Sequence, residues 1–174
     1  MSKIKENSGV LVQGHIKIHD PESGAVFVNK RNAIHYENMS IALAESVANQ
    51  GQGFISSMAF GNGGTSVDPT GIITYLTPNS TGTNASLYNQ TFTKIVDDRS
   101  VSNLDPQRNK IETRHVNGTN YTDVVVTCLL DYGEPNGQDA TDTASASDSL
   151  YVFDELGLVS CLLYTSDAAD EDLR

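Results

Sequence analysis

Apolar residues alternate with polar residues, or form short runs, along most of the chain, and this pattern predicts strands. The first strands form a hairpin, in which Val10–Val12 and His15–His19 make the outgoing strand and Ala25–Val28 the return. Asp20–Gly24 is the turn, because its Pro fixes φ and its Gly accepts a positive φ. Gly14 interrupts the outgoing strand and is interpreted as a bulge.

One segment has helical periodicity instead. After Asn32 the apolar residues recur at roughly helical spacing, at Ile34, Ile41, Ala44, Val47 and Ala48. Asn32 is suited to cap the start of a helix, and Gly51 is suited to end it. The pattern therefore predicts one principal α-helix over about residues 33–50.

Short strands separated by turns follow the helix. Phe54–Phe60 is mostly apolar and leads into the glycine-rich loop Gly61–Gly64. Val67–Gly71 contains Pro and Gly and predicts a turn before the short β-branched strand Ile72–Leu76. Tyr88–Val96 alternates between polar and apolar residues and predicts a further strand.

The strongest hairpin signal lies in the second half of the chain. Lys110–Val116 and Tyr121–Leu130 flank an Asn117-Gly118 pair, which favours a tight two-residue turn. Val124–Leu130 is uniformly apolar, so we expect a central strand. Leu150–Phe153 is expected to begin the last strand.

Together these elements predict an α+β protein with a β-rich, antiparallel and sandwich-like architecture. No internal repeat or linker divides the sequence, and we expect a single domain over residues 1–160.

The C-terminal residues 161–174 have a different character. Cys161–Glu171 matches the translation of a transposon-type sequencing adapter, and such segments are set aside before fold reasoning. We therefore expect residues 161–174 to be an artefact and the natural chain to be interrupted at about Ser160. A genuine polar tail is the alternative.

Composition and charge restrict the partners. The chain has 174 residues and a formal net charge of −11. An acidic chain without a basic stripe is a poor candidate for binding nucleic acid, in which neutralisation of phosphates dominates the affinity. No stretch approaches the roughly 18 apolar residues of a membrane span, so no membrane association is expected.

The sequence contains few residues suited to catalysis or metal binding. Cys128 lies in an apolar run with no neighbouring base, which predicts a small buried hydrophobic residue and no nucleophile. Gly61–Gly64 lacks the Lys and the following helix of a phosphate-binding loop. His15 and His19 are four residues apart on a predicted strand, a span of about 13 Å, so both cannot bind one ion.

The acidic residues were considered as ligands for calcium, which binds carboxylate oxygens. They are Asp97 and Asp98 and the loop residues Asp139, Asp142 and Asp148. No Asp-x-Asp-x-Asp-Gly pattern is present, so a solvated acidic loop is expected. No catalytic, metal or cofactor residues are predicted, although two distant carboxylates across a cleft would favour a glycan hydrolase.

Five segments together resemble virion structural proteins of marine tailed phages, especially cyanophage-like myoviruses. They are Lys30–Asn38, Met58–Thr65, Tyr88–Thr91, Gly133–Pro135 and Phe153–Leu158, which span most of residues 10–160. The order of the elements is also similar, over a shorter match, to the N-terminal domains of phage tail fibres.

This resemblance implies a non-catalytic structural subunit of a tailed-phage virion, assembled in the host cytoplasm. A role in the tail, the baseplate or fibre attachment is favoured, and a head, neck or decoration protein is the alternative. The partners would be further copies of the chain and other phage structural proteins. We expect subunit contacts at the Ala-rich helix face and the open sheet edges. The long loops Thr65–Tyr75, Thr77–Ser86 and Asp131–Asp148 would reach neighbouring proteins or solvent.

A receptor- or glycan-binding module, directed to a host surface, is a further interpretation. Asn-, Thr- and Gly-rich loops favour it, while the absence of Trp argues against it. The aromatic candidates are Tyr75, Tyr88, Tyr121 and Tyr132.

Overall fold

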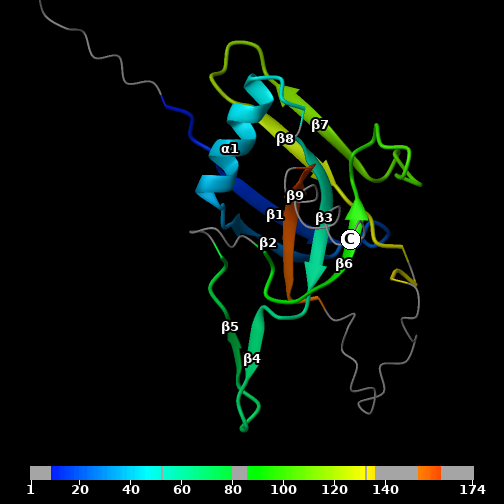
Figure 1. Cartoon of the computed structure of the whole chain (residues 1–174). Helices are drawn as coiled ribbons and strands as arrows, with labels where there is room; N and C mark the ends of the chain where they lie inside the picture. Colours follow the sequence, from blue (N-terminus) through cyan, green and yellow to red (C-terminus); the bar gives the residue numbers. More distant parts are fainter. Residues whose placement is uncertain (1–8, 52, 80–85, 132, 136–152, 162–174) are drawn as a thin grey trace, which may run out of the picture.

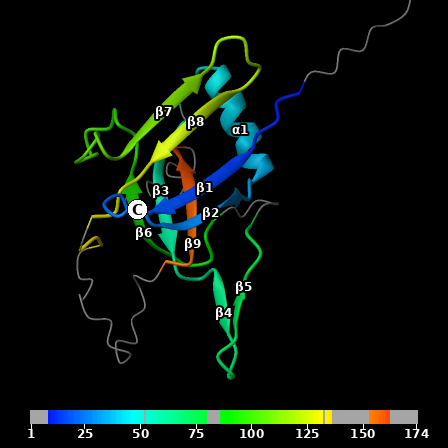
Figure 2. The ribbon, with the colours of Figure 1, turned by 180° about the vertical axis from the view of Figure 1, so that it is seen from behind.

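The computed structural model describes residues 9–51, 53–79, 86–131, 133–135 and 153–161 (Figures 1 and 2). These residues form one helix and nine strands. In chain order they are β1 Gly14–His19, β2 Val26–Asn32, α1 Tyr36–Val47, β3 Ile55–Gly61, β4 Thr65–Val67, β5 Ile73–Tyr75, β6 Gln90–Ile95, β7 Lys110–His115, β8 Thr122–Thr127 and β9 Glu155–Ser160. The prediction of a β-rich α+β fold is confirmed.

The strands form one three-stranded sheet and three two-stranded ribbons. The central sheet has the order β6-β3-β9, and both of its pairings are antiparallel. The ribbons are β1-β2, β4-β5 and β7-β8, each a hairpin of consecutive strands. Because β9 pairs with β3 almost a hundred residues earlier in the chain, the sheet joins segments that are far apart in the sequence.

The buried apolar residues gather on the central sheet. Among the described residues, the buried hydrophobic side chains are Ala59, Phe60 and Val96. Phe60 lies opposite Phe92 in the β3–β6 register, and Phe153 packs beside both. The ring centroid of Phe60 lies 5.1 Å from that of Phe153 and 5.9 Å from that of Phe92, distances typical of favourable aromatic pairs.

The β1–β2 hairpin crosses the central sheet on the side that faces the reader in Figure 2. Ile16 and Val28 are half-buried, while the alternate residues are exposed. The bulge lies between Ile18 and His19, opposite Phe27, and not at the predicted Gly14. Gly14 pairs regularly with Asn32, and a Cβ on it would lie 3.1 Å from the Asn32 Cβ, so close packing explains this glycine.

The helix is shorter than predicted. It covers Tyr36–Val47, and its N-cap is His35, whose Nδ1 accepts a hydrogen bond from the Asn38 amide at 3.2 Å. Asn32, the predicted cap, is instead the last residue of β2. Strand pairing with β1 holds Asn32 extended, so the helix can begin only after the chain has left the hairpin.

Two strand predictions need correction. The β7–β8 hairpin forms at Asn117-Gly118 as predicted, but β8 pairs only with β7 among the described residues, and Val124 is 58 % exposed. The apolar run is therefore not a central strand. The last strand begins at Glu155, after Phe153, and Leu150–Val152 lie outside the described residues.

The described part of the chain extends one residue beyond β9. The Cys161 amide donates a hydrogen bond to the Phe54 carbonyl at 3.1 Å, and residues 162–174 lie outside the described part. The adapter assignment and the single-domain assignment stay predictions. No helix among the described residues is long and apolar enough to cross a membrane.

Candidate docking site

The glycine-rich segment after β3 is the tight exit loop that the sequence predicts. It leads into β4, and no helix follows directly. The loop packs against the backbone before β6: a Cβ on Gly63 would lie 2.7 Å from the Asn89 nitrogen and 2.8 Å from the Tyr88 Cβ. The Asn62 amide also donates to the Asn89 carbonyl at 3.0 Å. Glycine is required at position 63 because any side chain would displace the segment that precedes β6.

Glu155, at the start of β9, holds this loop from the other side. Its Oε1 accepts hydrogen bonds from the Gly63 amide at 3.1 Å and the Asn89 amide at 2.7 Å. Its Oε2 accepts a hydrogen bond from the Tyr88 amide at 2.8 Å. One carboxylate thus joins three backbone donors from two segments, and a charged acceptor strengthens each bond.

Asp154 extends the arrangement to the base of the next hairpin. Its Oδ1 accepts from the Gly64 amide at 2.9 Å, and its Oδ2 accepts from the Thr65 hydroxyl. Its own amide donates to the Gly61 carbonyl at 3.0 Å. We call Asp154 and Glu155 together the acidic clamp.

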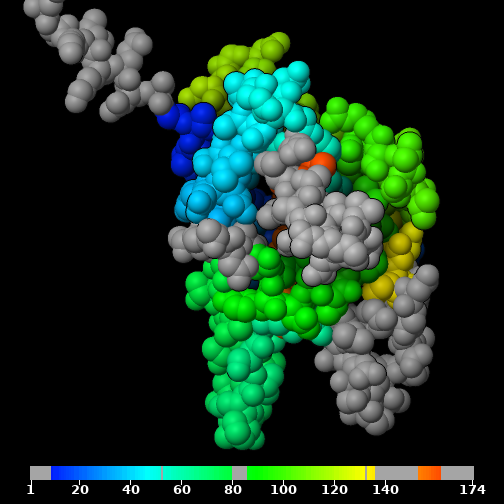
Figure 3. Space-filling model, viewed as in Figure 1, coloured from blue at the N-terminus to red at the C-terminus, as the bar shows by residue number. Residues whose placement is uncertain are grey.

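The hairpin that starts at the clamp projects away from the rest of the molecule (Figures 1 and 3). We call residues 65–76 the arm. Its strands β4 and β5 share three register pairs, from Thr65↔Tyr75 to Val67↔Ile73. At its base, the Leu76 amide donates to the Gly64 carbonyl at 2.8 Å. The arm is therefore a β-ribbon fixed at one end.

Asp68 organises the tip of the arm. Its Oδ1 accepts from the Thr70 amide at 2.8 Å, the Thr70 hydroxyl at 2.6 Å and the Ile72 amide at 3.0 Å. Gly71 completes the turn with φ +85°, a conformation that favours glycine. The hydrogen bond from the Thr70 hydroxyl, helped by the backbone amides, lowers the pKa of Asp68.

Four apolar side chains of the arm are largely exposed. Val67 and Ile72 are each 62 % exposed, Ile73 is 57 % exposed and Tyr75 is 75 % exposed. Asp68 is the only Asp, Glu, Lys, Arg or His in residues 65–76, and its acceptor is engaged in the turn. The arm thus presents several exposed apolar side chains and little charge on a fixed scaffold.

A second polar group lies beside the central sheet. The Lys94 ammonium donates to the Leu129 carbonyl at 2.6 Å and forms an ion pair with Glu134. Burial alone would raise the pKa of Glu134, but hydrogen bonds from Lys94 and the Asp131 amide outweigh it, so this pKa is lowered. Burial raises the pKa of the half-buried Cys128 to about 11, so this thiol stays protonated at neutral pH.

The other candidates do not form a common site. His15 and His19 both lie on β1, as predicted, and the described residues contain no group of three potential metal ligands. Asp97 accepts from the Arg99 amide at 3.0 Å. Asp139, Asp142 and Asp148 lie outside the described residues.

The aromatic candidates are also separated. Tyr75 lies on β5, and Tyr121 lies between β7 and β8, so they occupy opposite ends of the molecule (Figure 1). The Tyr88 hydroxyl donates to the Thr77 carbonyl at 2.6 Å, which fixes this ring near the base of the arm. Tyr132 lies outside the described residues.

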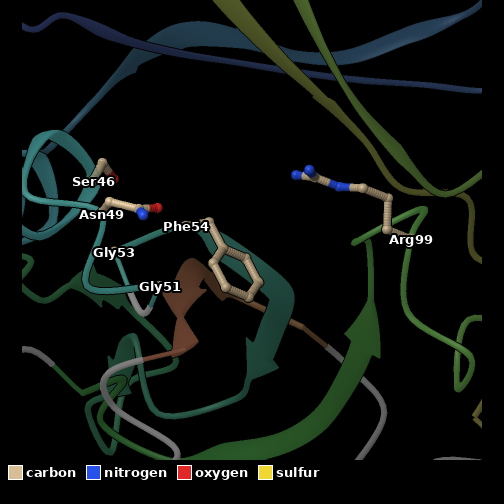
Figure 4. A pocket seen from close by; sticks show the side chains of 6 residues that line it. All are labelled: Ser46, Asn49, Gly51, Gly53, Phe54 and Arg99. Atoms are coloured by element: carbon tan, nitrogen blue, oxygen red, sulfur yellow. The ribbon is translucent and has the colours of Figure 1, made fainter.

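A hollow of about 300 Å³ lies between the end of α1 and Arg99 (Figure 4). Its described lining is Ser46, Asn49, Gly51, Gly53, Phe54 and Arg99. Arg99 is the only ionisable side chain among these residues, and it also lies 3.8 Å from an Asp97 carboxylate oxygen. No carboxylate pair of the kind considered for glycan hydrolysis is found in this part of the lining.

Sequence reasoning had singled out the segments that build the clamp without assigning a role to Asp154 or Glu155. The sequence feature that points to this role is the pair of adjacent acidic residues before the last strand. The amides of the Gly-rich loop need acceptors, and these two carboxylates can supply them. Comparison of the chain with protein-family models, with curated proteins and with solved structures finds no match.

Proposed function

We propose that this chain is a non-catalytic structural subunit of a tailed-phage virion, acting in the tail, the baseplate or the attachment of a fibre. The observation that carries the proposal is the arm, a fixed hairpin that presents apolar side chains to solvent. The resemblance of the five sequence segments to marine-phage virion proteins supplies the biological setting.

Exposed apolar surface is unfavourable in water. A contiguous apolar patch on a soluble protein is typical of a contact site, because its removal from water contributes about 25 cal/mol per Å². The clamp and Asp68 fix the conformation of the arm before it binds a partner. The arm therefore loses little conformational entropy on binding. Tyr75, the most exposed of the four apolar side chains, is of a residue type enriched at interface centres.

The rest of the described surface agrees with an assembly role. Val101 and Leu104 are almost fully exposed in the loop between β6 and β7. That loop is held by Asn103, whose side-chain amide donates to the Asp97 and Asn109 carbonyls. Apolar residues on a fixed loop are a second surface suited to contact with another protein.

Purified particles of a phage that carries this gene test the proposal directly. Peptides of the chain should be detected by mass spectrometry in proportion to the known tail proteins, after tails have been separated from heads. Recovery in the head fraction would favour the head or neck role. Absence from intact particles would overturn the structural role.

A further inference from the structure

The β1–β2 hairpin has one face turned away from the central sheet. Strand alternation and the register His15↔Arg31 and Lys17↔Asn29 place these four side chains on that face, and all four are exposed. We call it the outer face. Phe27, the extra residue of the bulge, is 69 % exposed.

The Lys and Arg residues on this hairpin differ from the other described Lys and Arg residues because they form no ion pair. In the described part of the chain, Lys and Arg residues with an ion pair are Lys94, Arg99, Arg108, Lys110 and Arg114. The three described cations without an ion pair are Lys17, Lys30 and Arg31, and all three lie on β1 or β2. The described part of this acidic chain therefore has its unpaired Lys and Arg residues on one hairpin.

The helix presents complementary features. Glu37 is exposed and Glu45 half-exposed on α1, and neither has an ion pair within the described chain. They are eight residues apart, or about 12 Å along the axis. Tyr36, Ile41 and Val47 are exposed apolar residues of the same helix.

The helix and the outer face lie on different sides of the molecule. Figure 1 shows α1 on the near side, and Figure 2, from behind, shows β1–β2 on the near side. One copy therefore cannot join its own two surfaces, but two copies can. A contact between unlike surfaces is head-to-tail and propagates into a ring or a filament.

We propose that the outer face of β1–β2 docks α1 of a second copy of this chain. Lys17 and Arg31 meet the carboxylates of Glu37 and Glu45, and Phe27 meets Ile41, which helical periodicity places on the same face as the two carboxylates. This inference rests on the proposed structural function and names one partner for it. Each surface contributes one hairpin or one helix, less than the 20–30 residues per side of a standard interface, so the pairwise contact is weak and sensitive to salt.

A second protein copy fits this face better than a nucleic acid. Binding of a nucleic acid depends on many phosphate contacts. The hairpin has only Lys17, Lys30 and Arg31 against Asp20 and Glu22, a net charge of +1 with His neutral. The carboxylates of a short helix require no more positive charge than this.

Charge exchange in the full chain tests the pairing. Mass should be measured by light scattering or sedimentation over a range of protein and salt concentrations. We expect the wild-type mass to increase with protein concentration at low salt and to fall as salt is added. Lys17→Glu with Arg31→Glu should remove association, as should Glu37→Lys with Glu45→Lys. All four substitutions together should restore it.

A matched control changes the same charges elsewhere. Lys110→Glu with Arg114→Glu alters the net charge equally on the β7–β8 hairpin and should leave association intact. Circular dichroism should show that each variant is folded. A wild-type chain that stays monomeric at every salt concentration would overturn the inference, as would association that survives either reversal.

Retention of nucleic acid or anionic vesicles by the outer face, without self-association, would overturn the inference as well. Detection of the chain in virions is a separate measurement. A monomer found in virions would therefore refute this contact and leave the structural role standing.

Discussion

The central sheet and the arm use apolar residues in opposite ways. In the sheet, Phe60 is 7 % exposed and packs against two further phenylalanine rings. The arm follows β3 in the chain. Its side chains Ile73 and Tyr75 are mostly exposed, and its ribbon has just three register pairs. The sheet is stabilised by burial, whereas the arm is held by hydrogen bonds at its base and tip.

This difference shows how a small hairpin can stand away from a protein without a core of its own. An isolated two-stranded hairpin is at best marginally stable in water. Here the clamp fixes the base and Asp68 fixes the turn, so no apolar side chain has to be buried to maintain the shape. The apolar residues consequently remain available for a partner.

Removal of a sheet phenylalanine should have the largest effect on folding. Phe60→Ala leaves a cavity beside the two remaining rings, Phe92 and Phe153, and is expected to lower the free energy of unfolding by about 3–5 kcal/mol. Phe27→Ala, at an exposed site, is the matched control and should change it by about 0.5 kcal/mol or less. Urea denaturation followed by circular dichroism measures both. Equal effects of the two substitutions would refute the view that burial stabilises the sheet.

Removal of the Glu155 carboxylate of the acidic clamp should have the next largest effect on the free energy of unfolding. Glu155→Ala leaves the Gly63, Tyr88 and Asn89 amides without their acceptor, and we expect a loss of about 2 kcal/mol. Glu155→Gln keeps one acceptor oxygen and should lose less. Hydrogen exchange at these amides, with Glu22→Ala as control, should localise the change to the base of the arm. An unchanged exchange rate at Gly63 would contradict the clamp.

Local sequence signals predicted the local parts of this fold. Asn117-Gly118 and the Val67–Gly71 segment form turns as expected, because their conformations depend on φ preferences within a few residues. The predicted extent of α1 was wrong, because Asn32 pairs with β1 and therefore does not cap the helix. The position of Val124–Leu130 was wrong as well, because an apolar run does not specify how many neighbours a strand has.

The clamp could not be predicted from the sequence in the same way. The Gly63 amide and the Glu155 carboxylate are 92 residues apart, and no periodicity links them. The outer face was missed for a similar reason. Arg31 and Lys17 share a face only through the register of β1 and β2, so the sequence showed dispersed cations in an acidic chain.

Acid should loosen the tip of the arm through Asp68. The folded pKa of Asp68 is lowered by its hydrogen bonds, so its stabilisation is present above the unfolded value, about 3.8, and is lost as the pH falls through the folded value. Amide chemical shifts of Thr70 and Ile72 should therefore move at acid pH, while that of Ala59 should not. In Asp68→Asn, whose amide oxygen still accepts, this transition should be absent. A transition in the variant would show that another group is responsible.

A charged residue on the arm should have the smallest effect on folding and a large effect on assembly. Ile73 is already exposed, so Ile73→Asp is expected to change the free energy of unfolding by about 0.5 kcal/mol or less. The same substitution places a charge on the apolar surface and should reduce incorporation into particles, measured by quantitative mass spectrometry of virions. Val116→Asp, at an exposed site beside the β7–β8 turn, is the matched control and should be incorporated normally. If Ile73→Asp destabilised the chain as much as Glu155→Ala, the arm would belong to the folded core, and its apolar residues would have a structural role in the monomer. If it folded normally and also entered particles normally, docking by the arm would be refuted.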